Sequence, residues 1–416
     1  MTANPLFPRR LRAGLALVTA VALSGVLTAC DEAPTGAAAA PSGALTGLAQ
    51  QVVAAGAPGV IVRVDDGGGH PVEIARQAPW STADHTLTAA DRFRMGSNTK
   101  TMVATVVLQL VAENRLRLSD PVEKWLPGLV PDGGAITLRM LLAHTSGLFN
   151  YLFDPDVLKA FTGQDTRAWT PREVLAAGVR HDPLFAPGTG YSYSNTNYVA
   201  LGLVAEKATG QPLAGLVQER IAVPLHLTGT YLVEGNDEGA QSSALAHGYE
   251  PDAAHVAALL PEGTPAGTAF AGPARPAGYV DTTSVNTSTE WAAGGMVSTA
   301  RDWATFDGAL LSGKLLPPAL LAEMKTTGPE EPEIPDRRYG LGLEQVTTPC
   351  GTVWGHNGQI TGYSAEAYTD DTGTRTASVL TSTIFGLKPP KAGAANRNLV
   401  NAAVCAMLGK PIPAVA

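Results

Sequence analysis

The chain has 416 residues, a net charge of −8 and three cysteines. This length exceeds what one compact core normally reaches, which predicts either two domains or one large fold in two parts. The acidic balance and the lack of a basic tract argue against a nucleic acid partner, because binding phosphates needs clustered lysine and arginine. Three cysteines are too few for a disulfide-built scaffold and lack the spacing of a metal site.

The first 29 residues predict an export signal rather than part of the fold. Arginines within 9–12 precede an apolar, small-residue run over 13–27, which is too short for a confident membrane span. The run ends at Leu27-Thr28-Ala29-Cys30, which resembles a bacterial lipobox, in which the cysteine is lipidated. An ordinary signal peptide that precedes a cysteine is the alternative. Residues 30–43 predict a flexible tether, so we expect a protein outside the cell membrane, held by lipid on Cys30, or secreted if not lipidated.

The following elements are predicted in chain order. Two strands at 59–65 and 72–76 are joined by a glycine-rich turn at 66–69. Helical spacing predicts helices over 97–112, 172–179 and 197–208, whereas 235–285 lacks periodicity and predicts loops. Strands return at 339–346, 351–356, 362–369 and 374–383, before a last helix over 392–408. Strands at both ends with helices between them predict one sheet built from both termini with an inserted helical region, an α/β (α+β) class.

Export changes how the two remaining cysteines are interpreted. In an oxidising compartment, Cys350 and Cys405 could form a disulfide. Cys350 lies in a predicted turn between strands, and Cys405 lies near the end of the last predicted helix. A bridge would therefore attach that helix to the sheet. Two buried free thiols are the alternative.

The first motif that carries chemistry is Ser97-Asn98-Thr99-Lys100. Ser97 is expected at a helix N-terminus, where free N–H groups favour developing negative charge. Lys100, three residues later, shares its helix face. A buried, neutral lysine can take the proton of a serine and make it a nucleophile. A helix-capping serine with a solvent-exposed lysine is the alternative.

The second motif is Tyr193-Ser194-Asn195, in a polar turn before a predicted helix. A loop tyrosine beside a cationic lysine is expected to have a lowered pKa and to transfer protons. The Asn195 amide can donate to a substrate carbonyl. A packing tyrosine and a helix-capping asparagine are the alternatives.

The third motif is His356-Asn357-Gly358, placed after the strand residues 352–354. A glycine there allows a flat ligand to lie against an edge strand and to pair with its backbone. A turn that ends the strand is the alternative.

Together, the order and wide spacing of the three motifs resemble the class C branch of the serine β-lactamase and penicillin-binding protein superfamily. The segments 93–100, 136–148, 187–198 and 339–343 extend the resemblance. The chain is similar to the secreted streptomycete D-alanyl-D-alanine carboxypeptidase/transpeptidase over about 44–410.

The resemblance implies a fold and a division of roles. The antiparallel sheet, flanked by helices, would come from 44–95 and 290–410, with a helical subdomain over about 120–285. Ser97 would form the acyl-enzyme, and Lys100 and Tyr193 would share proton transfer. The remaining implied site residues are Asn195 for the substrate amide, His356, Asn357, Gly358 and Gln359 on the strand, and Trp291, which lines the cleft or belongs to the core.

Further features follow from the same resemblance. The backbone N–H groups of Ser97 and Gln359 would form the oxyanion hole. His144 and Ser146 are expected to be structural, and the Cys350–Cys405 disulfide has a counterpart in the carboxypeptidase. No metal or organic cofactor is implied.

The chain departs from the carboxypeptidase at two places. Asn357 and Gln359 replace hydroxyl residues that would bind a substrate carboxylate, and Glu344 replaces an arginine. Repulsion by Glu344 could cost about 1–4 kcal/mol in a partly dehydrated cleft. A substrate with a free carboxylate is therefore expected to be poor.

These residues predict an exported serine hydrolase that acts on small peptides, amides or esters through an acyl-enzyme, with β-lactams as inhibitors or substrates. A D-alanyl-D-alanine carboxypeptidase is the main interpretation, an esterase or D-amino-peptide hydrolase the second, and a β-lactamase the third. The alternative from another class is a non-catalytic, penicillin-sensing or wall-binding lipoprotein. That alternative predicts loss of the nucleophile, base or tyrosine, and all three residues are present.

Overall fold

The computed structural model describes residues 41–235, 244–261, 263–330 and 336–413. Cys30 and the signal predicted over 1–29 lie outside these residues. In the described part of the chain, no helix combines the length and the hydropathy needed to cross a bilayer. The first helix, α1 (Pro41–Ala54), begins inside the predicted tether, so the prediction of flexible chain was wrong for its last three residues.

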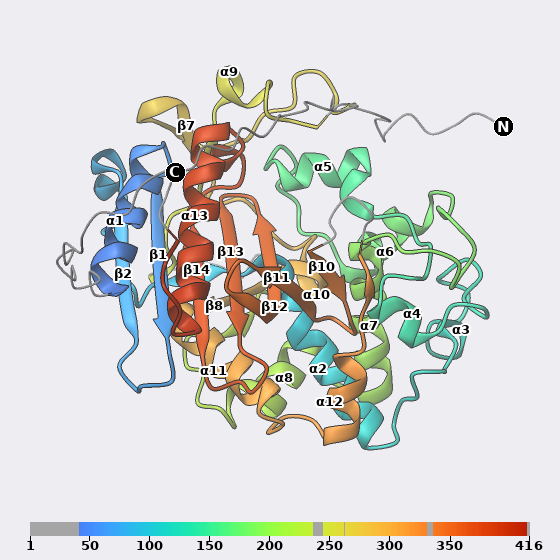
Figure 1. The fold of residues 1–416 in the computed structure, drawn as a ribbon. Helices are drawn as coiled ribbons and strands as arrows, with labels where there is room; N and C mark the ends of the chain where they lie inside the picture. Colours follow the sequence, from blue (N-terminus) through green and yellow to red (C-terminus); the bar gives the residue numbers. More distant parts are fainter. Residues whose placement is uncertain (1–40, 236–243, 262, 331–335, 414–416) are drawn as a thin grey trace, which may run out of the picture.

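An antiparallel sheet forms the centre of the described fold (Figure 1). Its strands are β1 (Gly59–Asp65), β2 (Val72–Gln77), β9 (Gly328–Pro329), β10 (Arg337–Tyr339), β11 (Glu344–Thr348), β12 (Gly351–Ile360), β13 (Tyr363–Thr369) and β14 (Thr376–Thr381). Their order is β2-β1-β14-β13-β12-β11-β10-β9. Val62 of β1 pairs with Val379 of β14 on one side and with Ile74 of β2 on the other. This pairing confirms the sheet that was predicted from both ends of the chain.

Helices cover both faces of this sheet. α1 and α13 (Pro390–Met407) contact each other and β1, and Figure 1 shows them on one face. α11 (Ala300–Leu311) packs against β13 and β14 from the other face. Cys350 and Cys405 form a disulfide, which attaches α13 to the turn between β11 and β12. The predicted bridge is therefore confirmed.

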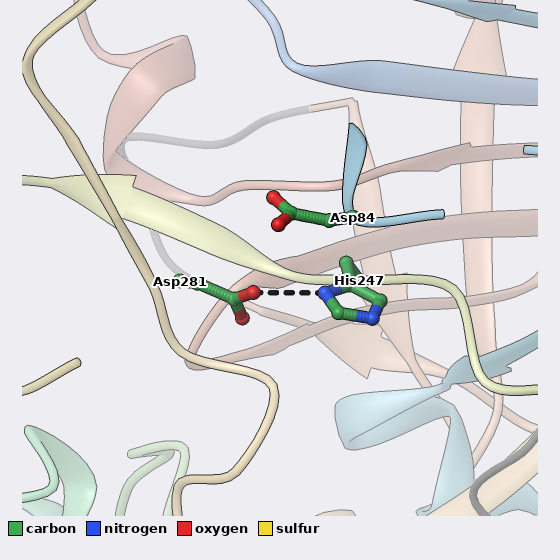
Figure 2. Close-up of side chains that lie close together, drawn as sticks. All are labelled: Asp84, His247 and Asp281. Atoms are coloured by element: carbon green, nitrogen blue, oxygen red, sulfur yellow. Dashed lines mark hydrogen bonds and ion pairs between the residues drawn. The ribbon is translucent and has the colours of Figure 1, made fainter. Parts of the chain in front are cut away.

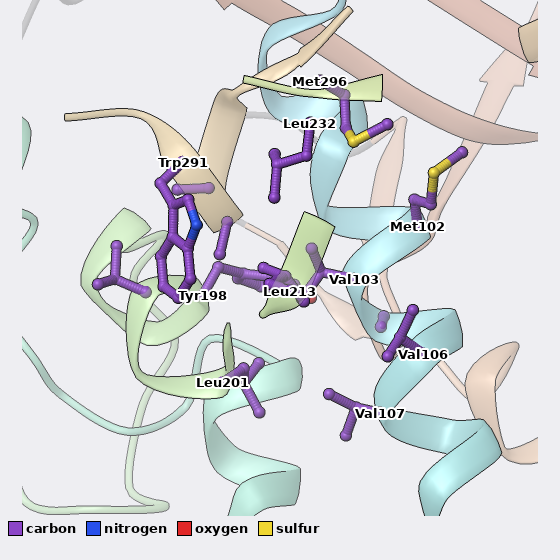
Figure 3. Packing of buried hydrophobic residues seen from close by; sticks show 14 of the residues in the cluster. Met102, Val103, Val106, Val107, Tyr198, Leu201, Leu213, Leu232, Trp291 and Met296 are labelled. Atoms are coloured by element: carbon purple, nitrogen blue, oxygen red, sulfur yellow. The ribbon is translucent and has the colours of Figure 1, made fainter. Parts of the chain in front are cut away.

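The inserted helical lobe packs around α2 (Thr99–Ala112), which is buried along nearly its whole length. Its helices are α3 (Val122–Trp125), α4 (Leu138–Leu142), α5 (Pro155–Phe161), α6 (Pro171–Val179), α7 (Asn195–Thr209) and α8 (Leu213–Val217). Val103 and Val106 of α2 lie opposite Leu201 of α7 and Leu213 of α8 (Figure 3). Burying these side chains stabilises the lobe by about 1.5–3 kcal/mol for each.

Two sequence predictions about secondary structure were wrong. The segment 235–285 contains the helix α9 (Ala253–Val256) and a small sheet of β5 (Tyr249–Pro251), β7 (Tyr279–Asp281) and β6 (Ala274–Arg275). The predicted strand at 339–346 is instead two strands, β10 and β11, because the chain turns at 340–343, where Gly342 has a φ of 78°.

A further sheet contains, in this order, β3 (Arg92–Arg94), β8 (Met296–Thr299) and β4 (Tyr231–Leu232). The remaining helices of the described residues are α10 (Trp291–Gly294) and α12 (Pro318–Met324).

Candidate active site

Ser97 lies on η2 (Gly96–Asn98), a single 3-10 turn that leads directly into α2. The turn is attached to two sheets. Met95 N donates to Met296 O at 2.9 Å, and the Asn98 side-chain amide donates to Ala365 O of β13 at 3.1 Å. The nucleophile predicted from sequence is therefore held between the sheets and the helical lobe.

Lys100 is fully buried on the first turn of α2. Its Nζ donates to Ser97 Oγ at 3.0 Å, to Asn195 Oδ1 at 2.6 Å and to Ala293 O at 2.7 Å. Burial lowers the pKa of Lys100 to about 7, although the carboxylates Glu290 and Glu344 oppose this shift. A large fraction of the lysine is therefore neutral near physiological pH and can accept the Ser97 proton.

Tyr193 lies beside the nucleophile, but its titration differs from the sequence prediction. The ring centroid is 4.8 Å from Lys100 Nζ and 4.3 Å from the His144 ring. Burial raises the pKa of Tyr193 well above its usual value, and the neighbouring Ser97 opposes the shift. The expected lowered pKa was wrong because burial, with the nearby Glu344 carboxylate acting in the same direction, outweighs the effect of Ser97. Tyr193 is thus a protonated hydroxyl that can relay a proton.

The loop that carries Tyr193 is held by two residues for which only a structural role was expected. Ser194 N donates to His144 Nδ1 at 3.1 Å, and Ser146 Oγ donates to Asn197 Oδ1 at 2.6 Å. Burial lowers the pKa of His144 well below its usual value, so the ring is neutral and Nδ1 can accept a hydrogen bond. This arrangement agrees with the structural role expected for His144 and Ser146.

Asn195 is the first residue of α7 and connects Lys100 to the helical lobe. Its Oδ1 accepts from Lys100, and its Nδ2 donates to Asn150 Oδ1 at 3.2 Å. One N–H of the amide is left for a substrate, because an amide group carries two donors. Asn150 was not predicted as a site residue, because it stands in a loop without a motif of its own.

The third motif lies inside β12, not after a strand. β12 pairs with β13 along 354–360, but its pairing with β11 ends at Gly355, opposite Glu344. In the described residues, Asn357, Gly358 and Gln359 therefore have a strand partner on one side only. Such a free edge can accept an extended substrate as an added strand.

His356 faces the protein interior, not the solvent. Its Nε2 lies 3.0 Å from Tyr339 Oη, and its side chain is 1% exposed. Burial and the nearby Lys100 lower the pKa of His356 to about 3. The ring is neutral, so it supplies a hydrogen-bonding group and no positive charge for a substrate carboxylate.

Close packing of glycines brings β12 against the nucleophile. A Cβ on Gly96, which has a φ of 51°, would lie 2.6 Å from the backbone nitrogen of Gln359. The backbone at Ser97 and the backbone at Gln359 are thus adjacent, as an oxyanion hole between them needs.

Glu344 and Trp291 lie deeper than a cleft-lining role would need. Glu344 is 1% exposed, and its Oε2 accepts from Arg337 Nη1 at 3.0 Å. Burial raises the pKa of Glu344 to about 8, opposed by Arg337. The sequence predicted that Glu344 would place an uncompensated negative charge at the cleft, but Arg337 compensates this charge. Trp291 belongs to the core and packs against Gly202 of α7, in agreement with the core alternative (Figure 3).

A second polar cluster lies apart from Ser97 and joins Asp84, His247 and Asp281 (Figure 2). Their ligand atoms lie within 4.8 Å of one another, as in a metal site. However, Arg275 Nε donates to both oxygens of Asp84, at 2.9 and 2.7 Å, and His247 Nδ1 lies 2.8 Å from Asp281 Oδ2. Because a guanidinium group already neutralises these carboxylates, the cluster is an ion-pair network that connects β7 to the segment before β3.

Comparisons with known proteins agree with this geometry. A family model described as Beta-lactamase matches residues 45–402. The chain is 38% identical over 193 residues to Esterase EstB of Burkholderia gladioli, which covers 43% of this chain and 48% of the esterase. It is 30% identical over 185 residues to Penicillin-binding protein 4* of Bacillus subtilis. This match covers 44% of this chain and 39% of the relative. The chain thus aligns with less than half the length of these two relatives.

Two solved structures align over nearly their whole length. A D-stereospecific amidohydrolase from Streptomyces sp. is 36% identical, with a TM-score of 0.70, and the match covers 86% of this chain and 98% of the amidohydrolase. The D-amino acid amidase from Ochrobactrum anthropi SV3, complexed with L-phenylalanine amide, is 26% identical, with a TM-score of 0.73. The match covers 89% of this chain and 99% of the amidase.

Proposed function

The chain belongs to the Beta-lactamase family, and we propose that it hydrolyses amides or esters of D-amino acids through an acyl-enzyme on Ser97. One observation carries the proposal. A fully buried lysine, whose pKa burial lowers to about 7, holds its Nζ 3.0 Å from the serine hydroxyl. A neutral amine at this distance is a general base for that hydroxyl.

The acylation step follows from these contacts. Neutral Lys100 takes the proton of Ser97 as Oγ forms a bond with the substrate carbonyl carbon. The carbonyl oxygen becomes an oxyanion, which the backbone N–H groups of Ser97 and Gln359 stabilise. The bond to the leaving amine or alcohol then breaks, and the leaving group takes the proton from Lys100 through the Tyr193 hydroxyl.

Deacylation uses the same groups in reverse. A water molecule attacks the ester carbon and passes its proton through Tyr193 to Lys100. The bond to Ser97 Oγ breaks, and the proton returns to that oxygen. The second N–H of Asn195 is free to hold the substrate amide while the free edge of β12 aligns the substrate chain.

The substrate class is proposed from the relatives and from the residues at the strand edge. The aligned amidohydrolase is named D-stereospecific, and the esterase relative is named for ester hydrolysis. Asn357 and Gln359 offer amides where a carboxylate-binding site would use hydroxyls. These points favour the amide and ester interpretation over the D-alanyl-D-alanine carboxypeptidase that was the main sequence prediction. Carboxypeptidase activity stays the second candidate, and the match to Penicillin-binding protein 4* supports a test with penicillin.

The proposed location is outside the cell membrane, anchored by lipid on Cys30. The lipobox-like sequence at 27–30 supports it, and so does the Cys350–Cys405 disulfide, since such bridges persist in oxidising compartments. Metabolic labelling with a palmitate analogue tests it. Label on the wild type that is absent from Cys30→Ser is expected, and an unlabelled wild type contradicts the anchor.

The test of the activity is a substrate panel on the purified full-length protein, with Ser97→Ala as the control. D-phenylalanine amide, L-phenylalanine amide and p-nitrophenyl acetate are compared with a D-alanyl-D-alanine peptide and its C-terminal amide. Fluorescent penicillin followed by intact-mass analysis locates the adduct. We expect acylation of Ser97 and preference for the D-amide. Preference for the free-acid peptide supports the carboxypeptidase instead, and tight penicillin binding without any turnover supports the non-catalytic sensor.

A further inference from the structure

Glu290 is a buried carboxylate that the proposed reaction leaves unused. It is 4% exposed and directly precedes α10, the short helix whose Ala293 carbonyl accepts a hydrogen bond from Lys100 Nζ. The Glu290 carbonyl accepts from Ala293 N at 2.7 Å and from Gly294 N at 2.9 Å. Glu290 and the lysine contact therefore belong to the same turn of backbone.

The carboxylate folds back over α10 toward this turn. A Cβ added to Gly294 would lie 2.7 Å from Glu290 Oε2, so a side chain at position 294 would displace the carboxylate from its present position. Among the described residues, Glu290 Oε1 is buried and has no hydrogen-bond partner. A buried carboxylate oxygen without a partner is costly when the group is charged, so the position of Glu290 needs an explanation.

The charged and titratable groups around Lys100 come from every element packed against it. The Tyr193 loop, α7 and the loop after α4 supply neutral groups, and η3 (Tyr151–Phe153) supplies a hydroxyl without a partner among the described residues. β12 supplies a neutral histidine. The two carboxylates that act on Lys100 are Glu290 and Glu344. These groups are Tyr193, Tyr198, His144, Tyr151, His356, Glu290 and Glu344.

Of these two carboxylates, only Glu290 lacks a cation of its own among the residues that the structure describes. Glu344 is bonded to Arg337. The positive group that acts on Glu290 is Lys100 itself. We therefore infer that Glu290 is a positioning residue that sets the proton occupancy of Lys100, so that the two side chains share one proton in the resting site. This inference rests on the proposed role of Lys100 as the base.

Shared protonation has a specific consequence for the pH dependence of acylation. Burial raises the pKa of Glu290 to about 7 and lowers the pKa of Lys100 to about 7, and each group opposes the other's shift. Two groups that interact in this way release their protons in two macroscopic steps. The neutral lysine therefore accumulates over a broad pH range, and activity rises in two steps.

The experiment measures kcat/KM for p-nitrophenyl acetate and the rate of penicillin acylation from pH 4.5 to 9.5. In the wild type, the negative charge of Glu290 stabilises the charged form of Lys100. Glu290→Gln removes this charge and therefore this stabilisation. The two-step rise should become one step, displaced to lower pH by about one unit. Glu290→Asp keeps the charge and should keep the two-step rise.

The matched control is Glu250→Gln. Glu250 is also fully buried, and burial raises its pKa to about 7, but it accepts hydrogen bonds from the backbone of Gly362, Ile384 and Phe385. Its substitution should lower the melting temperature without moving the pH profile. A purely structural role for Glu290 predicts the same result for Glu290→Gln.

Two outcomes overturn the inference. The first is a folded Glu290→Gln whose profile coincides with that of the wild type. The second, which needs no variant to fold, is a wild-type profile that rises in a single step. A wild type that is not acylated at any pH contradicts the proposed function itself, and this result is distinguishable from both outcomes above.

Discussion

Gly358 of β12 packs against the carbonyl oxygen of Met95, so closely that a Cβ at position 358 would lie 1.9 Å from that oxygen. This contact places the free edge of β12 beside the turn that carries Ser97. It also explains why the motif needs a glycine, since a side chain would push the strand away from the nucleophile.

Gly358→Ala should therefore reduce ester turnover by about 10²-fold or more, because displacing one side of an oxyanion hole costs about 3–4 kcal/mol. Steady-state kinetics and a melting curve test it. Gly215→Ala is the control, because a Cβ there meets no atom within 4 Å and the site lies within helix α8. The control should keep full activity and gain about 0.5–1 kcal/mol of stability. Unchanged kinetics for Gly358→Ala contradict the close-packing argument.

Replacing Lys100 separates its base function from its charge. Lys100→Arg keeps a cation that stays protonated, and Lys100→Met removes the amine. Both should slow penicillin acylation of Ser97 by about 10²–10⁴-fold, since neither side chain accepts the serine proton. Stopped-flow fluorescence measures this rate. Because the neutral lysine is the base, wild-type acylation should rise with pH through the region near 7. Rapid acylation by Lys100→Arg would show that the base is another group.

Arg337 compensates the buried Glu344 carboxylate, and a double-mutant cycle measures this coupling. Arg337→Met leaves the carboxylate buried without a cation, which should cost about 3 kcal/mol of unfolding free energy. The loss should increase with pH, because burial already raises the pKa of Glu344 to about 8 and removing Arg337 raises it further. Arg337→Met with Glu344→Gln should recover most of the loss. Urea unfolding at pH 6 and pH 9 tests both expectations, and additive effects of the two substitutions contradict the coupling.

The sequence predicted the regular parts of the fold well, because those parts are specified locally. The hairpin of β1 and β2 follows from β-branched apolar residues on either side of a glycine-rich turn, and α7 ends at Gly210, which adopts the left-handed conformation. The sheet of β5, β6 and β7 escaped prediction because its strands are two or three residues long. Such strands are stabilised by contacts with distant segments rather than by their own pattern.

The site was predictable in its residue types but not in its electrostatics. Ser97, Lys100, Tyr193 and Asn195 meet as the motifs indicate. The direction of the Tyr193 pKa shift depends on burial, which a local motif does not contain. Glu290 carries no motif, although a single acidic residue before the apolar run 291–297 is a signal that could have been followed.

The His247–Asp281 pair predicts a pH-dependent stability apart from the active site. The hydrogen bond to Asp281 raises the pKa of His247. A raised histidine pKa stabilises the fold below the pKa of the unfolded chain, and this contribution is lost as pH rises through the folded-state pKa. His247→Ala should thus cost about 1 kcal/mol at pH 6 and less at pH 9. Chemical unfolding at both pH values measures it, with the exposed His70→Ala as a control. Equal losses at the two pH values contradict the assignment.

The Cys350–Cys405 bridge closes a loop with a sequence separation of 55 residues, and this length sets its expected contribution to stability. Loop-closure entropy gives about 4 kcal/mol. Cys350→Ser with Cys405→Ser should lower the unfolding free energy by about this amount, and dithiothreitol should shift the wild type by a similar amount while leaving the double variant unchanged. Ester turnover at 25 °C should persist in both, because the bridge joins α13 to the turn before β12 and does not contact Ser97 or Lys100. Loss of turnover in a folded double variant would instead show that the bridge positions β12 for catalysis.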